Sequence, residues 1–379
     1  MQGLIDSTLR EGGQMVGVNF SLDQKLAIIA QLDRLGIEEI EVGVATSLDQ
    51  ALQPLFLGCR EKEINARLAL WCRCRDEDIA VAARLKPDVL SLSIPTSDLH
   101  ISKKLGKSRG WILEAVSRSL QLGQDLGIGY LSLGLEDATR AETGFLLEIV
   151  ATAATAGVDR VRLADTVGVA TPAELARLVT TLKENFTVAV GVHCHNDFGM
   201  ATANSLAALE AGADWADVTV LGLGERAGNA RLEEVAGFLA LRRHRDYRVS
   251  RFRELAELVS RLTGQPIPPH HPVLGEKIFY CESGLHLQGL DADPGTYEPY
   301  QPEQVGAERR LFYGSKIGVS QLLRHLTNTG LQAPPGKLGA LLQAIRTGTT
   351  RSDIPMEKAE LRELLTKHLG SSKELVGFP

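Results

Sequence analysis

Short apolar segments alternate with longer amphipathic segments eight times between residue 3 and about residue 240. The short segments, such as 37–44 and 188–193, are rich in β-branched residues and are typical of buried parallel strands. The longer segments carry apolar residues at helical spacing, and in 21–35 the first residue, Ser21, is suited to cap a helix. Eight strand–helix units over about 240 residues match the length and order of a (β/α)8 barrel. We therefore expect an α/β protein built on a TIM barrel.

A doubly wound open sheet is the alternative for the same alternation of strands and helices. When that fold binds a dinucleotide, a glycine-rich turn follows the first strand. Here residues 8–13 read Thr-Leu-Arg-Glu-Gly-Gly instead, so the barrel is favoured. The strands are expected at 3–5, 37–44, 68–71, 89–94, 130–133, 158–164, 188–193 and 218–221.

The alternation stops after residue 245. A helical pattern at 251–263 leads into the proline-rich segment 265–272, which cannot continue a helix. Residues 275–314 are rich in glycine and tyrosine, and short helical patterns return at 319–330, 337–347 and 356–368. We expect a catalytic barrel over 1–245 and, over 246–379, a C-terminal extension with a flexible arm and a small helical subdomain.

Composition excludes several classes of protein. Acidic residues outnumber basic ones, 47 against 41, and the net charge of −6 argues against a protein that binds nucleic acid or an anionic membrane. No apolar run approaches the ~20 residues that span a bilayer, and the N-terminus lacks the apolar region of a signal peptide. The five cysteines are few and scattered, so we expect a reduced, cytoplasmic protein.

A His-Cys-His-Asn-Asp sequence at 193–197 ends the seventh expected strand. Residues i and i+2 of a strand share a face, so His193 and His195 point the same way. Two imidazoles at the carboxyl end of a barrel strand, where barrel enzymes carry their chemistry, suit a divalent metal. The bare pattern is equally consistent with two unrelated histidines at the entrance to a loop.

The first and eighth strands supply further candidate ligands. Strands one, seven and eight are consecutive neighbours in a closed eight-stranded barrel. Asp6 and Glu11 follow the first strand, and Asn229 lies in a glycine-rich segment after the eighth. A carboxylate, two histidines and an amide oxygen can therefore meet around one ion. The spacing does not decide between Asp6 and Glu11, and either acid can instead pair with Arg10.

Three motifs in this order are distinctive: Asp-Ser-Thr-Leu-Arg-Glu-Gly at 6–12, His-Cys-His-Asn-Asp at 193–197 and Gly-Glu-Arg-Ala-Gly-Asn at 224–229. Together they resemble the signatures of the DRE-TIM metallolyases, and more narrowly of the Claisen-condensing branch. That branch contains homocitrate, 2-isopropylmalate, citramalate and Re-type citrate synthases. The resemblance extends over nearly the whole chain, and 68–137 is most similar to the homocitrate synthases of nitrogen-fixing bacteria.

The resemblance implies roles for residues of the barrel. Four residues are implied to hold a divalent ion, Mg, Mn or Zn: Glu11, His193, His195 and, more weakly, Asn229. Arg10 is implied to face the substrate as a catalytic residue, Thr166 to hold the 2-oxo acid, and Glu41, at the end of the second strand, to lie near it.

The extension carries two further implied catalytic residues. Ser-Gly-Leu-His at 283–286 and Tyr-Glu-Pro at 297–299 match the family's catalytic histidine and tyrosine, here His286 and Tyr297. In the family these residues usually reach the site of a partner subunit, which implies a homodimer. Imidazole titrates nearest physiological pH, so His286 is the candidate base for the acetyl-CoA methyl group.

The implied reaction condenses acetyl-CoA with 2-oxoglutarate to give homocitrate and CoA. The distal carboxylate of 2-oxoglutarate needs a cationic group, and Arg73 or Arg75 after the third strand can supply one. Arg75 is equally plausible as a solvated arginine beside Asp76 and Asp78. Oxaloacetate is one methylene shorter, so a Re-type citrate synthase is the first alternative, since one methylene is worth only ~1–3 kcal/mol of discrimination.

The sequence is also compatible with other functions. A 2-isopropylmalate or citramalate synthase needs an apolar acceptor pocket. A hydroxymethylglutaryl-CoA lyase carries a cysteine in the glycine-rich loop after strand eight, and 224–228 contains none. A non-catalytic metal scaffold has no use for Arg10, Thr166 and His286 together.

The chain also departs from the family pattern. Gly13 and Gly191 stand where relatives often carry acids, and 314–318 lacks the usual histidine and serine. We expect no leucine feedback, since the chain ends too early for that regulatory domain.

Overall fold

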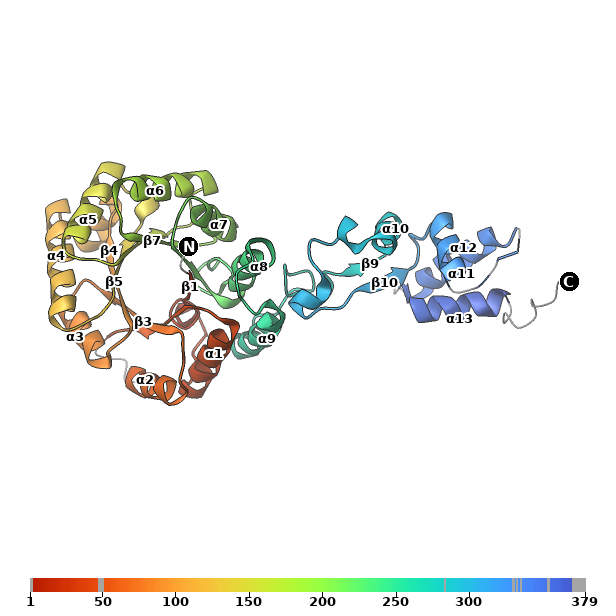
Figure 1. Ribbon diagram of the computed structural model, residues 1–379, viewed down its shortest axis with the longest axis horizontal. Coiled ribbons are helices and arrows are strands. Elements are labelled where there is room, and N and C mark those ends of the chain that lie inside the picture. The colour runs from red at the N-terminus through yellow and green to blue at the C-terminus, as the bar shows by residue number, and fades with distance from the viewer. Residues whose placement is uncertain are drawn as a thin grey trace. The chain divides into compact units, whose positions relative to one another are not determined.

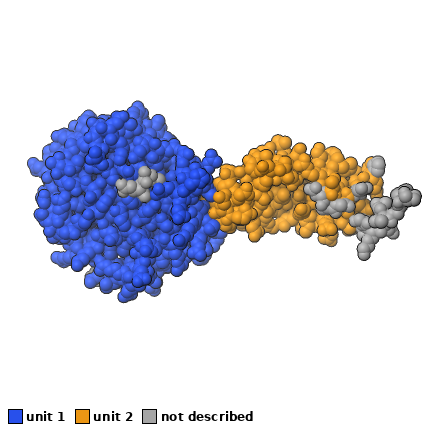
Figure 2. Space-filling model, viewed as in Figure 1, with its two compact units in different colours: residues 1–267 blue, residues 268–379 orange. Residues whose placement is uncertain are grey.

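The computed structural model describes residues 3–46, 51–282, 284–328, 331, 333–334, 336–352 and 355–369. It divides into two compact units, residues 1–267 and 268–379 (Figure 2). A helix is also expected from the sequence at 48–64, and its first residues, 48–50, lie outside the described residues. So do residues 329–330, at the end of the helical pattern expected at 319–330. Among the helices described, none is both long and apolar enough to cross a lipid bilayer.

The first unit is a closed barrel of eight parallel strands, which confirms the predicted (β/α)8 fold (Figure 1). The strands are β1 (Gly3–Asp6), β2 (Glu39–Val44), β3 (Arg67–Arg73), β4 (Val89–Pro95), β5 (Leu131–Glu136), β6 (Arg160–Asp165), β7 (Ala189–Cys194) and β8 (Trp215–Val218). The helices are α1 (Leu22–Leu35), α2 (Leu52–Glu61), α3 (Asp76–Leu85), α4 (Arg109–Asp125), α5 (Thr143–Thr155), α6 (Pro172–Asn185), α7 (Ala201–Glu210) and α8 (Leu232–Arg243). Pairing of β1 with β8 closes the barrel.

Helix α1 shows how the local sequence sets these elements. The Ser21 hydroxyl accepts a hydrogen bond from the Gln24 N–H, and the Gln24 side-chain oxygen accepts one from the Ser21 N–H. These two bonds form a capping box. Gly36 ends the helix with a φ of 86°, a left-handed conformation that glycine adopts without strain. The helix buries one face against the barrel, formed by Ile28, Ile29, Leu32 and Leu35.

The eighth strand differs from its expected position. It was expected at 218–221, whereas β8 ends at Val218 and a turn over Val220–Gly222 follows. Leu221 has a φ of 58°, which no strand residue adopts. The sequence did not indicate a strand over Trp215–Val218 because that segment contains the polar residue Asp217, whereas a barrel strand is expected to be apolar on both faces.

A buried ionic cluster fills the N-terminal end of the barrel. The Arg160 guanidinium is fully buried and donates to both carboxylate oxygens of Glu39, at 2.6 and 3.0 Å. Arg67 donates to the same carboxylate at 2.7 Å. Both guanidinium groups lie over the rings of Tyr130 and Trp215, at 4.6–5.5 Å. One buried carboxylate therefore binds two guanidinium groups at this end, of which Arg160 is enclosed and Arg67 is partly exposed.

Replacement of Glu39 by alanine is expected to lower the free energy of unfolding by about 3–5 kcal/mol, because it leaves the buried charge of Arg160 without the carboxylate that balances it. Urea denaturation of the isolated variant measures this change. Glu61→Ala, at the exposed end of α2, is the matched control and should stay within about 0.5 kcal/mol. A loss of less than about 1 kcal/mol for Glu39→Ala contradicts the stabilising role of this pair.

The first unit continues past residue 245, because α9 (Phe252–Thr263) packs against α1. The second unit has its own three-stranded sheet, in the order β11 (Met356–Glu357), β10 (Arg310–Tyr313), β9 (Tyr280–Cys281). Its helices are α10 (Gly284–Ala292), α11 (Val319–Asn328), α12 (Leu338–Ser352) and α13 (Lys358–Leu369). A separate apolar core holds them together, with Leu322, Ile345 and Leu361 fully buried at its centre.

Candidate functional site

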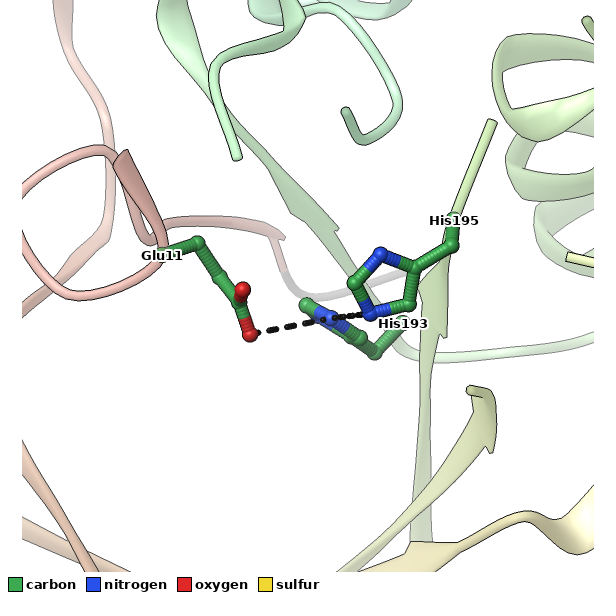
Figure 3. Close-up of side chains that lie close together, drawn as sticks. All are labelled: Glu11, His193 and His195. Atoms are coloured by element: carbon green, nitrogen blue, oxygen red, sulfur yellow. Dashed lines mark hydrogen bonds and ion pairs between the residues drawn. The ribbon is translucent and has the colours of Figure 1, made fainter. Parts of the chain in front are cut away.

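The carboxyl ends of β1 and β7 bring together a carboxylate and two imidazoles (Figure 3). Glu11 lies in the loop after β1, His193 lies in β7 and His195 directly follows β7. His193 Nε2 is 3.4 Å from Glu11 Oε1 and 3.3 Å from His195 Nε2. One potential ligand atom from each residue lies within 4.8 Å of the others, and all three side chains are buried. This donor set is one that binds divalent transition metals in catalytic sites.

Asp217 fixes the orientation of His193. Its Oδ2 lies 2.8 Å from His193 Nδ1, so the imidazole proton belongs on Nδ1 and the lone pair of Nε2 faces Glu11 and His195. Burial lowers the pKa of His193, and burial, with a smaller effect from the positive charges of Arg226 and Arg10, lowers the pKa of His195 to about 2. Both imidazoles are therefore held neutral, the form that metal ligation requires.

Asn229 lies beside the cluster, bridged to His195 through the backbone. Its Nδ2 donates to the Leu223 carbonyl at 2.8 Å. Its Oδ1 is buried and has no hydrogen-bond partner within the described part of the chain. A buried acceptor without a partner costs free energy. This oxygen is therefore suited to bind a group that is not part of the protein chain, such as a metal ion.

Asp6, the other acid that the sequence left open, faces a different way. Its carboxylate accepts hydrogen bonds from the N–H and the hydroxyl of Thr8, at 3.0 and 2.9 Å. Burial raises its pKa to about 7. Of the two acids, Glu11 is therefore the one that meets the histidines.

A row of alternating charges leads from Arg10 to His193. Arg10 contacts Glu11, and its Nε donates to Glu41 at 2.5 Å. Arg162 then donates to Glu41 at 3.2 Å and to Asp217 at 2.8 Å. Burial alone raises the pKa of Glu41, but the charges of Arg10 and Arg162 outweigh it and lower the pKa to about 2. Glu41 was expected at the end of the second strand, whereas it lies in the middle of β2 and points to these arginines.

Thr166 follows β6 and is held from two sides. Its Oγ1 accepts the Asp137 N–H at 2.8 Å, and its carbonyl accepts from Arg226 at 2.8 Å. In the register of β6 and β7, Ala164 pairs with His193. The last pair of this register joins Asp165 to Cys194, so Thr166 and His195 are the first residues beyond the ends of two neighbouring strands.

Arg75 lines a cavity of about 660 Å³ beyond β3. Arg73 also lines it but is committed to Asp78, with bonds of 2.6 and 3.0 Å. Arg75 forms no ion pair with any residue that the structure describes. Trp71 forms another wall, and its ring lies 5.8 Å from the guanidinium carbon of Arg10, which in turn contacts Glu11.

His286 and Tyr297 form a pair within the second unit. Their ring centroids are 4.3 Å apart, and both line a cavity of about 260 Å³. A Cβ atom at Gly289 would lie 2.3 Å from the Tyr297 ring, so only glycine allows the tyrosine to pack against α10. His286 is exposed and Tyr297 is 45% exposed.

Sequence reasoning missed several groups near the carboxyl ends of the strands. Asp217 and Arg162 are buried polar residues within strands, a signal that an apolar strand pattern conceals. Glu136, at the end of β5, belongs to the segment 68–137 that carries the family resemblance, and the sequence assigned it no role. Its Oε1 lies 2.7 Å from His100 Nδ1 and 2.5 Å from Lys104 Nζ.

Two family models cover most of the chain. The model described as HMGL-like matches residues 2–259, and the model described as homocitrate synthase post-HMGL domain-like matches residues 273–353. Among curated relatives, 2-isopropylmalate synthase 2 of Caldanaerobacter subterraneus subsp. tengcongensis is 37% identical over 372 residues, 95% of this chain and 94% of that protein. Homocitrate synthase of Frankia alni is 40% identical over 340 residues, 86% of this chain and 93% of that protein.

A third relative and a solved structure extend the comparison. (R)-citramalate synthase of Methanocaldococcus jannaschii is 36% identical over 348 residues, 91% of this chain and 70% of that protein. The barrel is similar in fold to HMG-CoA lyase of Bacillus subtilis, with a TM-score of 0.62 at 20% identity over 70% of this chain and 95% of that one. The chain therefore belongs to the HMGL-like family, within its Claisen-condensing branch of 2-isopropylmalate, citramalate and homocitrate synthases.

Proposed function

We propose that this protein is a homocitrate synthase that condenses acetyl-CoA with 2-oxoglutarate and releases CoA. The observation that carries the proposal is the buried cluster of Glu11, His193 and His195 beside the anchored guanidinium of Arg10. Homocitrate synthases among the relatives support the acceptor, and the second family model supports the same assignment.

Different barrel residues are proposed to bind the acceptor and to polarise its ketone. Glu11, His193 and His195, with Asn229 as a weaker ligand, would hold a divalent cation, Mg, Mn or Zn. That cation supplies Lewis-acid polarisation of the acceptor's ketone. Arg10, held in place by Glu41, provides positive charge for the oxygen that becomes an alkoxide when the carbon nucleophile attacks.

His286 is the proposed base that takes a proton from the acetyl-CoA methyl group. The methyl carbon then bonds to the ketone carbon of the acceptor, and hydrolysis of the thioester releases CoA. The exposure of His286 and of its ring partner Tyr297 leaves both side chains available to a substrate. We propose that they act in the site of a partner subunit of a homodimer, as the family resemblance implies.

Arg75 is the proposed partner of the distal carboxylate of 2-oxoglutarate. It is exposed on a cavity wall, and no acid among the described residues neutralises it. A 2-isopropylmalate or citramalate synthase is the second candidate, because such enzymes are also among the relatives. Trp71, Ile94 and Leu105 give the same cavity an apolar wall that suits a branched acceptor.

A panel of acceptors tests the choice. Release of CoA thiol is measured with acetyl-CoA and 2-oxoglutarate, oxaloacetate, 2-oxoisovalerate or pyruvate. We expect kcat/KM to be highest for 2-oxoglutarate, by about tenfold or more over the next acceptor. Preference for 2-oxoisovalerate or pyruvate replaces the proposal with the second candidate, and preference for oxaloacetate makes the protein a citrate synthase.

Arg75→Ala refines the same experiment. It is expected to raise KM for 2-oxoglutarate by about 10- to 100-fold and to leave pyruvate unaffected, because only the former carries a distal carboxylate. Arg84→Ala, exposed in the last turn of α3, is the matched control. An equal effect of Arg75→Ala on both acceptors removes Arg75 from the acceptor site.

A further inference from the structure

Asp137 adopts an unusual backbone conformation directly after β5. Its φ of 61° and ψ of 34° lie in the left-handed region, which costs most residues other than glycine free energy and which Asp and Asn adopt when their side chains are bound locally. Its side chain is fully buried. Strain of this kind persists only where the surrounding structure enforces it, so the contacts of this residue carry information.

Three side chains enforce the conformation of Asp137. Arg140 donates to both carboxylate oxygens, from Nε at 2.8 Å and from Nη2 at 2.9 Å. The Ser97 hydroxyl donates to Oδ2. His100 Nε2 lies 3.7 Å from the same oxygen. The carboxylate is therefore bound both from the segment after β4, which carries Ser97 and His100, and from Arg140 in its own loop.

The consequence appears at Thr166. The backbone N–H of Asp137 points to Thr166 Oγ1 at 2.8 Å, so a lone pair of that hydroxyl is already occupied. A hydroxyl has one proton to donate. Within the described residues, Thr166 Oγ1 donates to no acceptor, and Arg226 holds its carbonyl from the opposite side. Thr166 therefore has a hydroxyl proton available to a ligand directly after β6, and His195 follows the neighbouring strand β7.

We infer that Asp137 is a positioning residue, which fixes the Thr166 hydroxyl as a donor to the carboxylate of the bound 2-oxo acid. The inference rests on the proposed function for the presence of a 2-oxo acid. A threonine hydroxyl has one proton and two lone pairs, and an ionised carboxylate can only accept a hydrogen bond. The Asp137 N–H holds Thr166 Oγ1 in place through one lone pair, which leaves the hydroxyl proton available for an anionic substrate.

A double-mutant cycle tests the inference. Thr166→Val removes the donor, and Asp137→Ala removes the side chain that holds the turn. Each variant is expected to raise KM for the acceptor by about 10- to 100-fold with a smaller change in kcat. Because both changes act through one hydroxyl, the double variant should be no weaker than Thr166→Val alone. Asp137→Asn, which tolerates the left-handed conformation and keeps acceptor oxygen, should recover most of the affinity.

The controls separate positioning from folding. Asp159→Ala is the matched control. The Asp159 carboxylate accepts the N–H of Leu131, the first residue of β5, and Asp159 precedes β6, whereas Thr166 follows it. Should Asp137→Ala not fold, Arg140→Met loosens the same turn and is expected to raise KM only when Thr166 is present. Thermal unfolding of every variant is measured beside the kinetics.

The dissociation constant for oxalate in the presence of Mn²⁺, measured by calorimetry, gives a second readout that does not depend on turnover. Additive effects of the two substitutions, or a fall in kcat without a rise in KM or in the oxalate constant, overturn the inference. A wild-type protein that binds oxalate but condenses no 2-oxo acid overturns the proposed function instead, and the cycle is then decided on the oxalate constants. A wild-type protein that neither binds oxalate nor turns over overturns both.

Discussion

His193→Ala is expected to reduce kcat/KM by about 10³- to 10⁵-fold, because the variant loses one of three ligands that would hold the polarising cation. The loss should match that of wild-type protein treated with EDTA, which is reversed by Mn²⁺, Mg²⁺ or Zn²⁺. Metal content by atomic absorption and thiol release with acetyl-CoA and 2-oxoglutarate measure the two effects. The fold should survive, since His193 contributes no bond to the barrel ladder through its ring.

Asp217→Asn gives a graded version of the same experiment. Asp217 accepts from His193 Nδ1 and orients the ring, so we expect metal affinity to fall by about 10- to 100-fold, less than for the ligand itself. His368→Ala, on α13 in the second unit, is the matched control for loss of a histidine. Full activity after exhaustive chelation, or a His193→Ala variant with more than a tenth of wild-type activity, contradicts the metal site.

His286→Ala is expected to lower kcat by about 10²- to 10⁴-fold, the usual contribution of a positioned general base. Metal content and acceptor affinity should stay unchanged, because the cluster of Glu11, His193 and His195 belongs to the other unit. Exchange of the acetyl-CoA methyl protons with deuterated water, followed by mass spectrometry in the presence of a non-reacting acceptor analogue, should fall in parallel. Retained exchange in the variant removes His286 from the proton-transfer step.

Mixing the two inactive variants tests whether His286 acts in the partner's site. In a hybrid dimer of His193→Ala and His286→Ala, one site would combine an intact cluster with an intact arm, so activity should return after subunit exchange. A mixture of one variant with itself is the control and should stay inactive. Absence of recovery in hybrids verified by native mass spectrometry places the histidine in its own subunit's site, and a fully active monomer in sedimentation excludes the proposed dimer.

The barrel could be predicted because its signal is long and repeated. Eight alternations leave few folds open, and the fold itself then brings strand ends that are distant in sequence to one face. That is why His193 and His195 could be associated with a carboxylate almost 200 positions away. The choice between Asp6 and Glu11 could not be made, because it depends on a turn in which Thr8 occupies the Asp6 carboxylate.

The supporting polar groups could not be predicted for a different reason. The contacts of Asp217 and Arg162 depend on how β6, β7 and β8 are paired. The sequence placed the eighth strand at 218–221, whereas β8 spans Trp215–Val218. A shift of one residue in register exchanges the two faces of a strand, so these side chains could not be assigned to the interior. The left-handed turn at Asp137 is likewise a tertiary feature, since it is held by Ser97 and Arg140.

The row of alternating charges has a consequence for redesign of this protein. Each of Arg10, Glu41, Arg162 and Asp217 balances its neighbours inside the barrel, so a lone substitution leaves a net charge a few ångströms from the cluster. Efforts to broaden the acceptor range should therefore leave this row intact and vary the wall around Arg75, where solvent tolerates a change of sign.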